Sequence, residues 1–533
     1  MYSSYTTLQR AQLAKQEYLD TQEVFLGVYA PGRNAALKAS LQDQLHRKFL
    51  LTDSLRPEAL GSAVGVLLVR EDLFLMPTAL SCFADALRSG ADYVTSDAVF
   101  GYSGVTTLYH SQGFAACPGC ALVSRELLRR CQAEARDPEN PVELLTLAAK
   151  LSRSHVCLPL ALAHYERDIC AEDVWSVKGK RVFIMSHLLD MTGAPIVLVS
   201  AVPVLRSMGY EVLVLGPSDG GSLHLFLDAG ASVITRSSCR NVSDAWGMAL
   251  CADFVIVNTV VMARAVRALS GTAVPVLWWL HDAFAGYPHI AHQIPTQLGE
   301  NVRVYSVGSH AANAMHAVRP EFEIRPLIYG LPDYAAENFV RTDLGYIRGR
   351  PLFATVGSFE RRKGHDIFCK AIRLLPPEVR EKASFLFVGQ AADKEMMDSV
   401  RTLTADYPEN VFYCKRLTFD EIKSLMEQCT GLVCASRDDP MPTFVTEGLI
   451  FGKPSIVSEH TGTAGLISEG RNGFVYHNDD PQQLAVLLEH AIEHPEELAS
   501  MRTECRKMYE QYYSKEAFEQ TLRAAVEDLT AKK

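Results

Sequence analysis

The 533-residue sequence has no apolar run that approaches the roughly 20 residues of a membrane-spanning helix. Its polar start, Met1-Tyr-Ser-Ser-Tyr-Thr-Thr7, lacks the apolar core of a signal peptide. It has no excess of basic residues either, since 52 Lys and Arg against 62 Asp and Glu give a formal net charge of −10. Because proteins that bind nucleic acids carry basic patches, this balance argues against a nucleic-acid partner. We therefore expect a cytoplasmic protein that binds no nucleic acid.

Cysteine is present, but not in the spacing of a disulfide framework. The 13 cysteines are scattered, and many stand in apolar segments, namely Cys82, Cys251, Cys369, Cys429 and Cys434. This placement predicts buried reduced thiols. Cys117-Pro-Gly-Cys120 has the spacing of a redox or zinc pair, but the second pair that a zinc site needs is absent. Internal repeats and low-complexity tracts are absent too. A chain of this length then predicts about two to four domains.

The N-terminal region is the least regular part of the sequence. Residues 1 to about 45 are polar and predict helices. From Gly61, strand-like and helix-like segments alternate up to an apolar segment at 155–166. This order resembles the second half of a family-2, GT-A-type glycosyltransferase domain. Too few residues precede Gly61 to build the half that binds the nucleotide, and Arg70-Glu71-Asp72 stands where that family's metal-binding Asp-x-Asp motif is expected. The resemblance implies a partial domain, residues 1–170, that is non-catalytic and serves a structural, acceptor-binding or oligomerising role.

Two further regions, residues 178–333 and 345–513, each alternate short buried strands with helices. This pattern predicts two α/β, doubly wound, Rossmann-like domains that face a cleft. In the first of them, Pro203 lies inside the helix expected at 196–208 and predicts a kink or an early break. In the second, Thr418-Phe-Asp-Glu421 is a capping box that predicts a helix start. An apolar stripe predicts a last helix within 514–533, which we expect to pack back across the cleft.

The second domain carries two candidate groups for an anionic ligand. Three cations, Arg361, Arg362 and Lys363, stand between a strand and a helix start, which is typical of a phosphate site but also of a solvated basic turn. Asp439 lies before the helix expected at 443–451, and Glu447 lies one turn inside it. This helix is expected between the strand 431–435 and a second short strand after Pro454. These carboxylates could accept sugar or ribose hydroxyls, or could be surface acids of an N-capping loop.

The first domain carries two weaker candidates. Gly193 lies at the first strand–helix turn, where it permits close approach of an anion to the backbone. His281 follows the strand-like segment 275–280, although a single histidine is more often structural than catalytic. All four groups fall at the carboxyl ends of strands, where α/β sheets bind their ligands. That joint placement predicts one site.

Residues 180–530 resemble the GT-B family-4 glycosyltransferases. The motifs that carry this resemblance are Val-Gly-x5-Lys-Gly-x-Asp (Val356–Asp366), Phe-Val-Gly (Phe387–Gly389), the Glu-x7-Glu signature as Asp439 to Glu447, Gly-x-Pro (Gly452–Pro454) and Asn-Gly-Phe (Asn472–Phe474). The resemblance implies retaining transfer of a hexose-type sugar from a UDP- or GDP-sugar, without a cofactor or an essential metal. It also implies a glycan or lipid-linked glycan acceptor, a setting in surface polysaccharide biosynthesis, and peripheral association with the inner face of the membrane.

The same resemblance assigns roles to individual residues. Lys363, with Arg361 or Arg362, would bind the donor diphosphate, and Gly193 would meet the phosphate. Glu447 would hold the ribose, and His281 would contact a sugar hydroxyl. Asp439 would contact the donor sugar together with the backbone of Thr443, Phe444 and Val445.

Two residues depart from the pattern of the family. Asp439 is one methylene shorter than the family's glutamate, which we expect to reshape the sugar pocket. Ser358 replaces the family's arginine in the donor site. The alternatives are a nucleotide-sugar epimerase or phosphorylase-like enzyme of the same fold, and a non-catalytic scaffold for glycan assembly.

Overall fold

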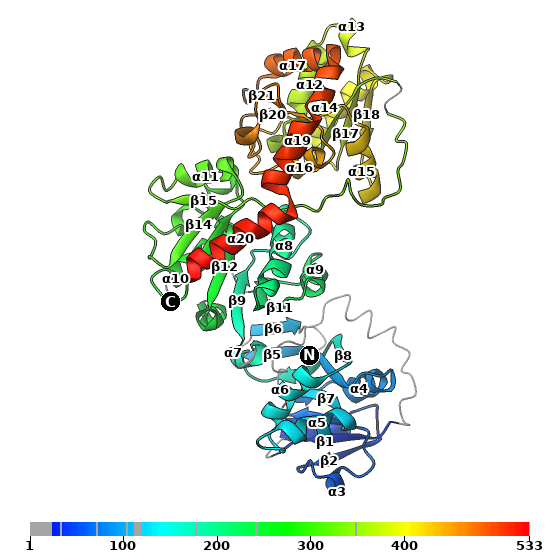
Figure 1. Ribbon diagram of the computed structural model, residues 1–533, viewed down its shortest axis with the longest axis vertical. Coiled ribbons are helices and arrows are strands. Elements are labelled where there is room, and N and C mark those ends of the chain that lie inside the picture. The colour runs from blue at the N-terminus through cyan, green and yellow to red at the C-terminus, as the bar shows by residue number, and fades with distance from the viewer. Residues whose placement is uncertain are drawn as a thin grey trace. The chain divides into compact units, whose positions relative to one another are not determined.

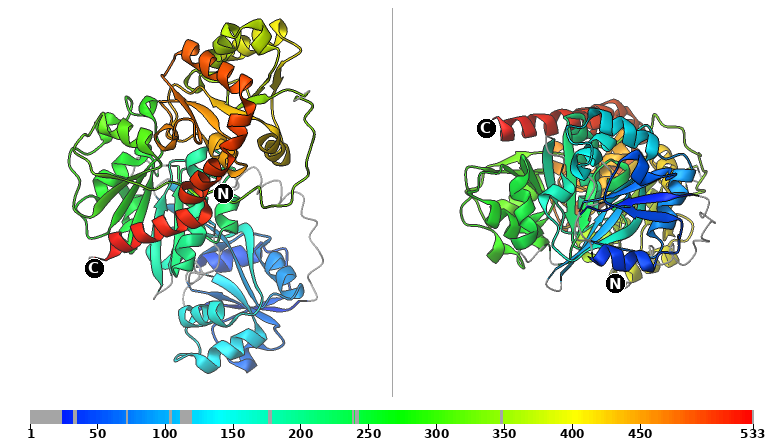
Figure 2. Two further views of the ribbon diagram at one scale, coloured as in Figure 1. Left: turned by 45° about the horizontal axis from the view of Figure 1, so that its top comes forward. Right: turned by 90° about the horizontal axis from the view of Figure 1, so that it is seen from below.

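The computed structural model describes residues 24–31, 35–70, 73–102, 105–110, 120–175, 179–237, 239, 243–346 and 349–531. These residues form two compact units (Figures 1 and 2). The first unit comprises Met1–Leu277, Leu298–Val302 and Leu529–Lys533, and the second comprises Trp278–Gln297 and Arg303–Asp528. In the part of the chain that the structure describes, no helix is long and apolar enough to cross a bilayer.

The first unit begins with three parallel strands, β1 (Leu26–Tyr29), β2 (Phe49–Thr52) and β3 (Gly65–Val69), connected by α2 (Ala35–Gln42) and α3 (Pro57–Leu60). The prediction that residues 1 to about 45 are helical is therefore wrong at β1. The expectation that too few residues precede Gly61 for a first α/β half is wrong as well. Both errors have one cause: the apolar run from Val24 to Ala30 is short and follows a long polar stretch, yet it is buried throughout β1.

The rest of the N-terminal region extends this sheet in the order β5-β7-β3-β1-β2. The strand β7 runs antiparallel to β3, and β8 lies beside β5. The elements are β4 (Phe74–Leu75), α4 (Ala79–Arg88), β5 (Tyr93–Tyr102), β6 (Val105–His110), β7 (Cys120–Ser124), α5 (Arg125–Glu134), α6 (Pro141–Leu151), β8 (His155–Tyr165) and α7 (Ala171–Val174). Glu71, Asp72 and Cys117 lie outside the described residues.

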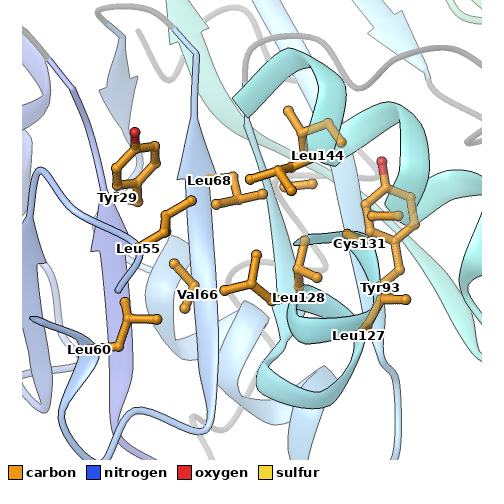
Figure 3. Packing of buried hydrophobic residues seen from close by; sticks show 14 residues of the cluster. Tyr29, Leu55, Leu60, Val66, Leu68, Tyr93, Leu127, Leu128, Cys131 and Leu144 are labelled. Carbon is orange, nitrogen blue, oxygen red and sulfur yellow. The ribbon is translucent and has the colours of Figure 1, made fainter. Parts of the chain in front are cut away.

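The core of this region lies between the sheet and the helices α5 and α6. Figure 3 shows Val66 and Leu68 of β3 facing Leu128, Cys131 and Leu144 of the helices. All of these side chains are at most 1% exposed. Their spacing in the sequence explains why they share one core, because alternate residues of a strand and every third or fourth residue of a helix lie on one face. The N-terminal region thus has a hydrophobic core of its own.

The middle of the sequence continues the sheet of the first unit. The strand order there is β12-β9-β10-β11, with neighbours parallel, and β11 pairs antiparallel with β6 of the N-terminal region. The elements are β9 (Lys180–Met185), α8 (Gly193–Ser207), β10 (Tyr210–Gly216), α9 (Leu223–Asp228), β11 (Ser232–Thr235), β12 (Phe254–Asn258) and α10 (Ala263–Leu269). Helix α8 runs through Pro203 to Ser207, so the early break predicted there is wrong. The unit boundary lies within β13 (Val276–Leu280).

A buried histidine joins the N-terminal region to the middle of the sequence. His110, on β6, contacts Asp97 Oδ2 through Nδ1 at 2.8 Å and Asp219 Oδ1 through Nε2 at 3.3 Å. Its side chain is 4% exposed. Burial alone would lower the pKa of His110, but the two carboxylates outweigh it and raise the pKa to about 10. The imidazole is therefore charged at neutral pH and bridges two segments of the sheet.

We expect replacement of His110 by asparagine to lower the melting temperature, because two carboxylates then face each other without a cation. Breaking a buried ion pair costs about 3–5 kcal/mol. Since the folded-state pKa lies above the unfolded value, the stabilising contribution is complete below about pH 6.5 and is lost as the pH rises through about 10. The difference in melting temperature between wild type and variant, measured by calorimetry at several pH values, should therefore become smaller from pH 6 to pH 9.5. A constant gap, or an equal effect of His224→Asn on the exposed face of α9, would contradict this account.

The second unit contains a six-stranded parallel sheet in the order β18-β17-β16-β19-β20-β21. Its strands are β16 (Leu352–Val356), β17 (Ser384–Val388), β18 (Val411–Cys414), β19 (Gly431–Cys434), β20 (Ser455–Ser458) and β21 (Gly473–Tyr476). The helices are α12 (His365–Leu374), α13 (Pro377–Arg380), α14 (Lys394–Asp406), α15 (Phe419–Gln428), α16 (Thr443–Ile450), α17 (Pro481–Glu493), α18 (Pro495–Ser500) and α19 (Arg502–Met508). Helix α12 packs on α14 and α17, and α16 packs on α19 (Figure 1). The predicted capping box of Thr418 and Glu421 is confirmed.

The second unit also holds most of the strand β14 (Val302–Ser306), the strand β15 (Ile324–Pro326), the helix α11 (Ser309–His316) and most of α20 (Lys515–Thr530). Helix α20 contacts the segment after residue 277. The Phe518 ring stacks on Trp279 with centroids 5.8 Å apart, and Asp528 binds Arg325 at 2.8 Å. Whether this helix crosses a cleft stays a prediction.

The predicted buried thiols are confirmed for Cys82, Cys369, Cys429 and Cys434, whereas Cys251 is exposed. Cys251 is the last residue of a 3-10 segment, Ser243–Cys251, rather than of the neighbouring strand, which explains its exposure. The cysteines that the structure describes are all free thiols.

Candidate functional site

The sheet of the second unit has a topological switch point between β16 and β19. The chain runs outward from β16 to β17 and β18, then returns to β19 on the other side of β16 and continues to β20 and β21. Loops that leave neighbouring strands in opposite directions open a crevice at the carboxyl ends of those strands. The segments that follow β16 and β19 are 357–364 and 435–442. They contain the predicted cations and the predicted acidic loop, respectively.

Gly364 brings these two segments together. It has a left-handed φ of 66°, and a Cβ atom there would lie 1.8 Å from the carbonyl oxygen of Ala435 at the end of β19. Arg437 completes the contact, because its backbone nitrogen donates to the Arg362 carbonyl at 2.7 Å and its guanidinium binds Asp366 bidentately at 2.8 Å. The turn η6 (Arg361–Lys363) is therefore fixed against the loop after β19.

The variant Gly364→Ala should lose several kcal/mol of folding stability, since the methyl group must displace backbone. Gly470→Ala is the matched control, because Gly470 has the same φ of 66° but a methyl group added to it would meet nothing within 4 Å. Backbone strain alone costs about 1 kcal/mol. In a thermal melt the Gly364 variant should therefore fall well below the Gly470 variant. Equal melting temperatures would show that the close approach to Ala435 is unimportant.

Lys363 and Asp439 form an ion pair between the segments that follow β16 and β19. The distance from Lys363 Nζ to Asp439 Oδ2 is 2.6 Å. Asp439 is 3% exposed, and its Oδ1 accepts a hydrogen bond from the Met441 amide at 3.3 Å. Because lysine has three N–H donors, Nζ can keep this pair and still donate to a second anion. The structure thus brings together a cation and a carboxylate that lie 76 positions apart in the sequence.

Glu447 lies on α16, the helix that follows the loop of Asp439, and its carboxyl group has a strongly raised pKa. Burial raises the pKa of Glu447 from 4.5 to about 7. Among the described residues, its carboxylate has no hydrogen-bond or ion-pair partner. At neutral pH the group is therefore partly ionised and able to accept hydrogen bonds from a ligand.

The predicted backbone donors, Thr443, Phe444 and Val445, form the first turn of α16. The cap residue is Pro442, which offers no side-chain acceptor to the first amides. The Val445 amide donates to the Pro442 carbonyl at 3.1 Å, whereas the amides of Thr443 and Phe444 donate to nothing among the described residues. Such amides and the helix dipole favour a negatively charged or hydroxyl oxygen.

The three predicted donor-site residues near Lys363 in the sequence differ in what they contact. Ser358 Oγ donates to Glu360 at 2.6 Å, and Arg362 binds the same carboxylate at 3.0 Å. Although burial alone would raise it, the pKa of Glu360 is held below its usual value by these contacts. The exposed guanidinium of Arg361 has no such partner in the described part of the chain. Arg361 is therefore the more available cation for an anionic ligand.

His281 follows β13, and its ring contacts the Trp279 ring in a tilted arrangement with centroids 4.7 Å apart. Reasoning from the sequence did not identify the residue that holds the turn after His281 in place. Asp438 accepts hydrogen bonds from the amides of Phe284 and Ala285 and from His310 Nε2. The only sequence signal for Asp438 is its position next to Asp439, and nothing in the sequence indicates its distant partners.

Gly193 belongs to the first unit, whereas the other predicted site residues belong to the second. It begins α8 after β9, and a Cβ atom there would meet nothing within 4 Å. β9 lies between β10 and β12, so Gly193 also follows a switch point.

Thr259, directly after β12, has a φ of 71°, which is a strained conformation for a β-branched residue. Within the described residues, no group of three or more His, Cys, Asp and Glu could hold a metal ion.

Comparison with known proteins agrees with this architecture. Residues 178–321 match the family model described as glycosyl-transferase family 4, and residues 338–508 match glycosyl transferases group 1. Spore coat protein SA of Bacillus subtilis (strain 168) is 27% identical over 28% of this chain and 41% of its own length. The uncharacterized glycosyltransferase MJ1178 of Methanocaldococcus jannaschii is 25% identical over 36% of this chain and 53% of its own length. The chain spans about half the length of these curated relatives.

A solved structure shows the same fold. Anabaena Alr3699/HepE, crystallised in complex with UDP, matches with a TM-score of 0.54 at 18% identity, over 66% of this chain and 100% of that one. The prediction of two Rossmann-like sheets is confirmed at this level, while both family matches begin after the N-terminal region. From about residue 178 onward, the chain belongs to the family 4 and group 1 glycosyltransferases, with the GT-B fold.

Proposed function

We propose that this protein transfers a sugar from a UDP-sugar to a glycan acceptor, with retention at the anomeric carbon and without an essential metal ion. The observation that carries the proposal is the convergence at the β16–β19 switch point. The ion pair of Lys363 and Asp439 and the uncapped N-terminus of α16 belong to segments that this switch point brings together. A nucleoside diphosphate sugar offers the diphosphate and the sugar hydroxyls that these groups would bind.

Lys363 and Arg361 would stabilise the diphosphate leaving group. In such a transfer the bond between the anomeric carbon and the phosphate oxygen breaks, so negative charge develops on the diphosphate. Fixed cations and free helix amides can stabilise this charge in the place of a metal ion. Lys363 is preorganised for the task, because Asp439 already holds its ammonium group at 2.6 Å. Gly193 is proposed to meet the phosphate.

Glu447 would accept the ribose hydroxyls, and Asp439 would accept a hydroxyl of the donor sugar. A carboxylate that has no protein partner and a pKa of about 7 gains its hydrogen bonds when the ribose binds. Asp439 would act with the amides of Thr443, Phe444 and Val445, and His281 would contact a sugar hydroxyl. HepE has been crystallised with UDP-glucose, which makes UDP-hexoses the first donors to test.

We propose that the N-terminal region, residues 1–170, is a GT-A-like domain without its own transfer activity. The proposal is supported by Arg70, which follows β3 and binds Asp173 at 3.3 Å. The resemblance to the GT-A family implies a metal-binding carboxylate at this position of the sequence, where this chain has a cation. The domain would bind the acceptor or mediate oligomerisation. The wider proposal is a domain order of 1–170, 178–333, 345–513 and a C-terminal helix at 514–533, in an enzyme of surface polysaccharide biosynthesis at the inner face of the membrane.

A donor screen tests the proposed function. Purified protein is incubated with UDP-, GDP- and dTDP-sugars, with and without glycan acceptors, and the released nucleotide is measured. We expect UDP release that an acceptor accelerates. Conversion of the donor sugar without nucleotide release would indicate an epimerase instead. Absence of both release and conversion with every donor would favour the scaffold alternative.

A further inference from the structure

Asp438 lies in the loop after β19, between two residues that bind other groups of the same domain. Arg437 binds Asp366, and Asp439 binds Lys363. The Asp438 carboxylate instead accepts three hydrogen bonds from residues 128 to 154 positions away in the chain. The donors are the Phe284 amide at 3.1 Å, the Ala285 amide at 2.8 Å and His310 Nε2 at 2.7 Å.

These donors belong to the turn that follows His281 and to the helix beside it. Phe284 and Ala285 lie in the 3-10 turn Phe284–Gly286. His310 lies in the first turn of α11, and its ring contacts the Phe284 ring with centroids 5.1 Å apart. The segment that carries His281 is therefore tied to the loop that carries Asp439 through one carboxylate.

Two glycines allow this close packing. A Cβ atom on Gly308 would lie 2.7 Å from Met441 Cε, and one on Gly462 would lie 1.7 Å from the Pro440 carbonyl oxygen. The turn before α11 and the loop after β20 both lie against the segment after Asp438. The backbone around this carboxylate is therefore held from two sides.

The Asp438 carboxylate is ionised in these surroundings. Burial alone would raise its pKa, but the His310 hydrogen bond and the two amides together hold the pKa of Asp438 below its usual value. The side chain is 13% exposed. An asparagine has nearly the same shape, but its amide nitrogen would face an N–H donor. Asp438→Asn should therefore break part of this hydrogen-bond network while the volume of the side chain stays nearly the same.

We propose that Asp438 is a positioning residue that holds the His281 turn against the donor-sugar site and thereby sets the rate of transfer. It does so without contact to the nucleotide, whose predicted ligands are Lys363 and Glu447. The effect on transfer rests on the proposed function, whereas the positioning itself does not.

Hydrogen exchange tests the positioning directly. The amides of Phe284 and Ala285 should exchange several-fold faster in Asp438→Asn than in wild type. Asp406→Asn is the matched control, because Asp406 is an exposed carboxylate of the same domain that binds Arg373 at 2.6 Å. His310→Asn should give a smaller increase, since it removes one of the three donors. Unchanged exchange at Phe284 and Ala285 in Asp438→Asn would overturn the proposal.

Kinetics of the same variants test the consequence. Asp438→Asn should lower kcat by about 10- to 100-fold, because a displacement of about 1 Å in a reactive site has an effect of this size. The Kd for UDP should stay within about threefold of wild type. Equal losses of UDP affinity and kcat would overturn the proposal and place Asp438 in the nucleotide site. If wild type releases no nucleotide from any donor, the proposed function fails, and the exchange experiment still decides whether Asp438 positions the turn.

Discussion

Replacing Lys363 with alanine should lower the rate of sugar transfer by about 100- to 1,000-fold, which is the usual effect of removing one group that stabilises developing negative charge. The variant loses the cation that is proposed to face the leaving diphosphate. It also leaves Asp439, which is 3% exposed, without its partner at 2.6 Å. A buried carboxylate without a cation destabilises the fold, so the variant should melt at a lower temperature as well.

A double variant separates these two effects. Lys363→Ala combined with Asp439→Asn removes both charges, and it should regain much of the lost stability while staying inactive. Lys370→Ala is the matched control for a lysine of the same domain, because Lys370 is 60% exposed and binds Asp366 at 3.3 Å. Transfer by Lys363→Ala at a rate close to that of Lys370→Ala would remove Lys363 from the donor site.

Replacing Glu447 with glutamine should have opposite effects on the empty and the nucleotide-bound protein. Burial raises the pKa of Glu447 from 4.5 to about 7, so the folded protein keeps a proton that the unfolded chain releases between these pH values. The free energy of unfolding of wild type therefore falls as the pH rises from about 4.5 to about 7. Glutamine has no charge to bury, so the empty variant should melt a few degrees above wild type at pH 8 and at the same temperature near pH 4.5.

Bound UDP should reverse the order of the melting temperatures of wild type and the Glu447→Gln variant. Hydrogen bonds to a charged group contribute about 1.5–3 kcal/mol, so glutamine should weaken UDP binding by roughly 10- to 100-fold. Saturating UDP should then raise the melting temperature of wild type much more than that of the variant. Glu378→Gln, which changes an exposed glutamate of α13, should leave both melting temperatures unchanged. A variant that is destabilised at pH 8 without ligand would show that Glu447 has a structural role instead.

Periodicity predicted most of the fold in the region after residue 178. The helix expected at 443–451 is α16 at Thr443–Ile450, and the strand expected after Pro454 is β20. These elements are readable because one face of each helix and the whole of each strand are buried, which leaves a pattern in the sequence. The strand β1 was missed because four buried residues after a polar stretch give too short a pattern. Pro203 predicts a kink or an early break, and the early break is wrong because α8 continues through Pro203 to Ser207.

Only the general location of the candidate site could be predicted from the sequence. The rule that ligands bind at the carboxyl ends of parallel strands placed Lys363 and Asp439 in one region. It could not predict that they form an ion pair, because that contact depends on the left-handed turn at Gly364. This turn packs so closely on β19 that a Cβ atom at Gly364 would lie 1.8 Å from the Ala435 carbonyl oxygen. The contacts of Asp438 with Phe284 and His310 are hidden for a similar reason. They are set by the packing of distant segments, which no local pattern records.

Titration calorimetry with UDP is the most direct test of the central claim, which is that Lys363 and Glu447 form a nucleotide-sugar site at the β16–β19 switch point. Wild type should bind one UDP per chain in a saturable manner, and a UDP-sugar substrate should compete with it. Lys363→Ala and Glu447→Gln should each weaken the binding by at least about tenfold, while Lys370→Ala and Glu378→Gln should not. Absence of UDP binding to wild type, or binding that none of these variants changes, would contradict the account.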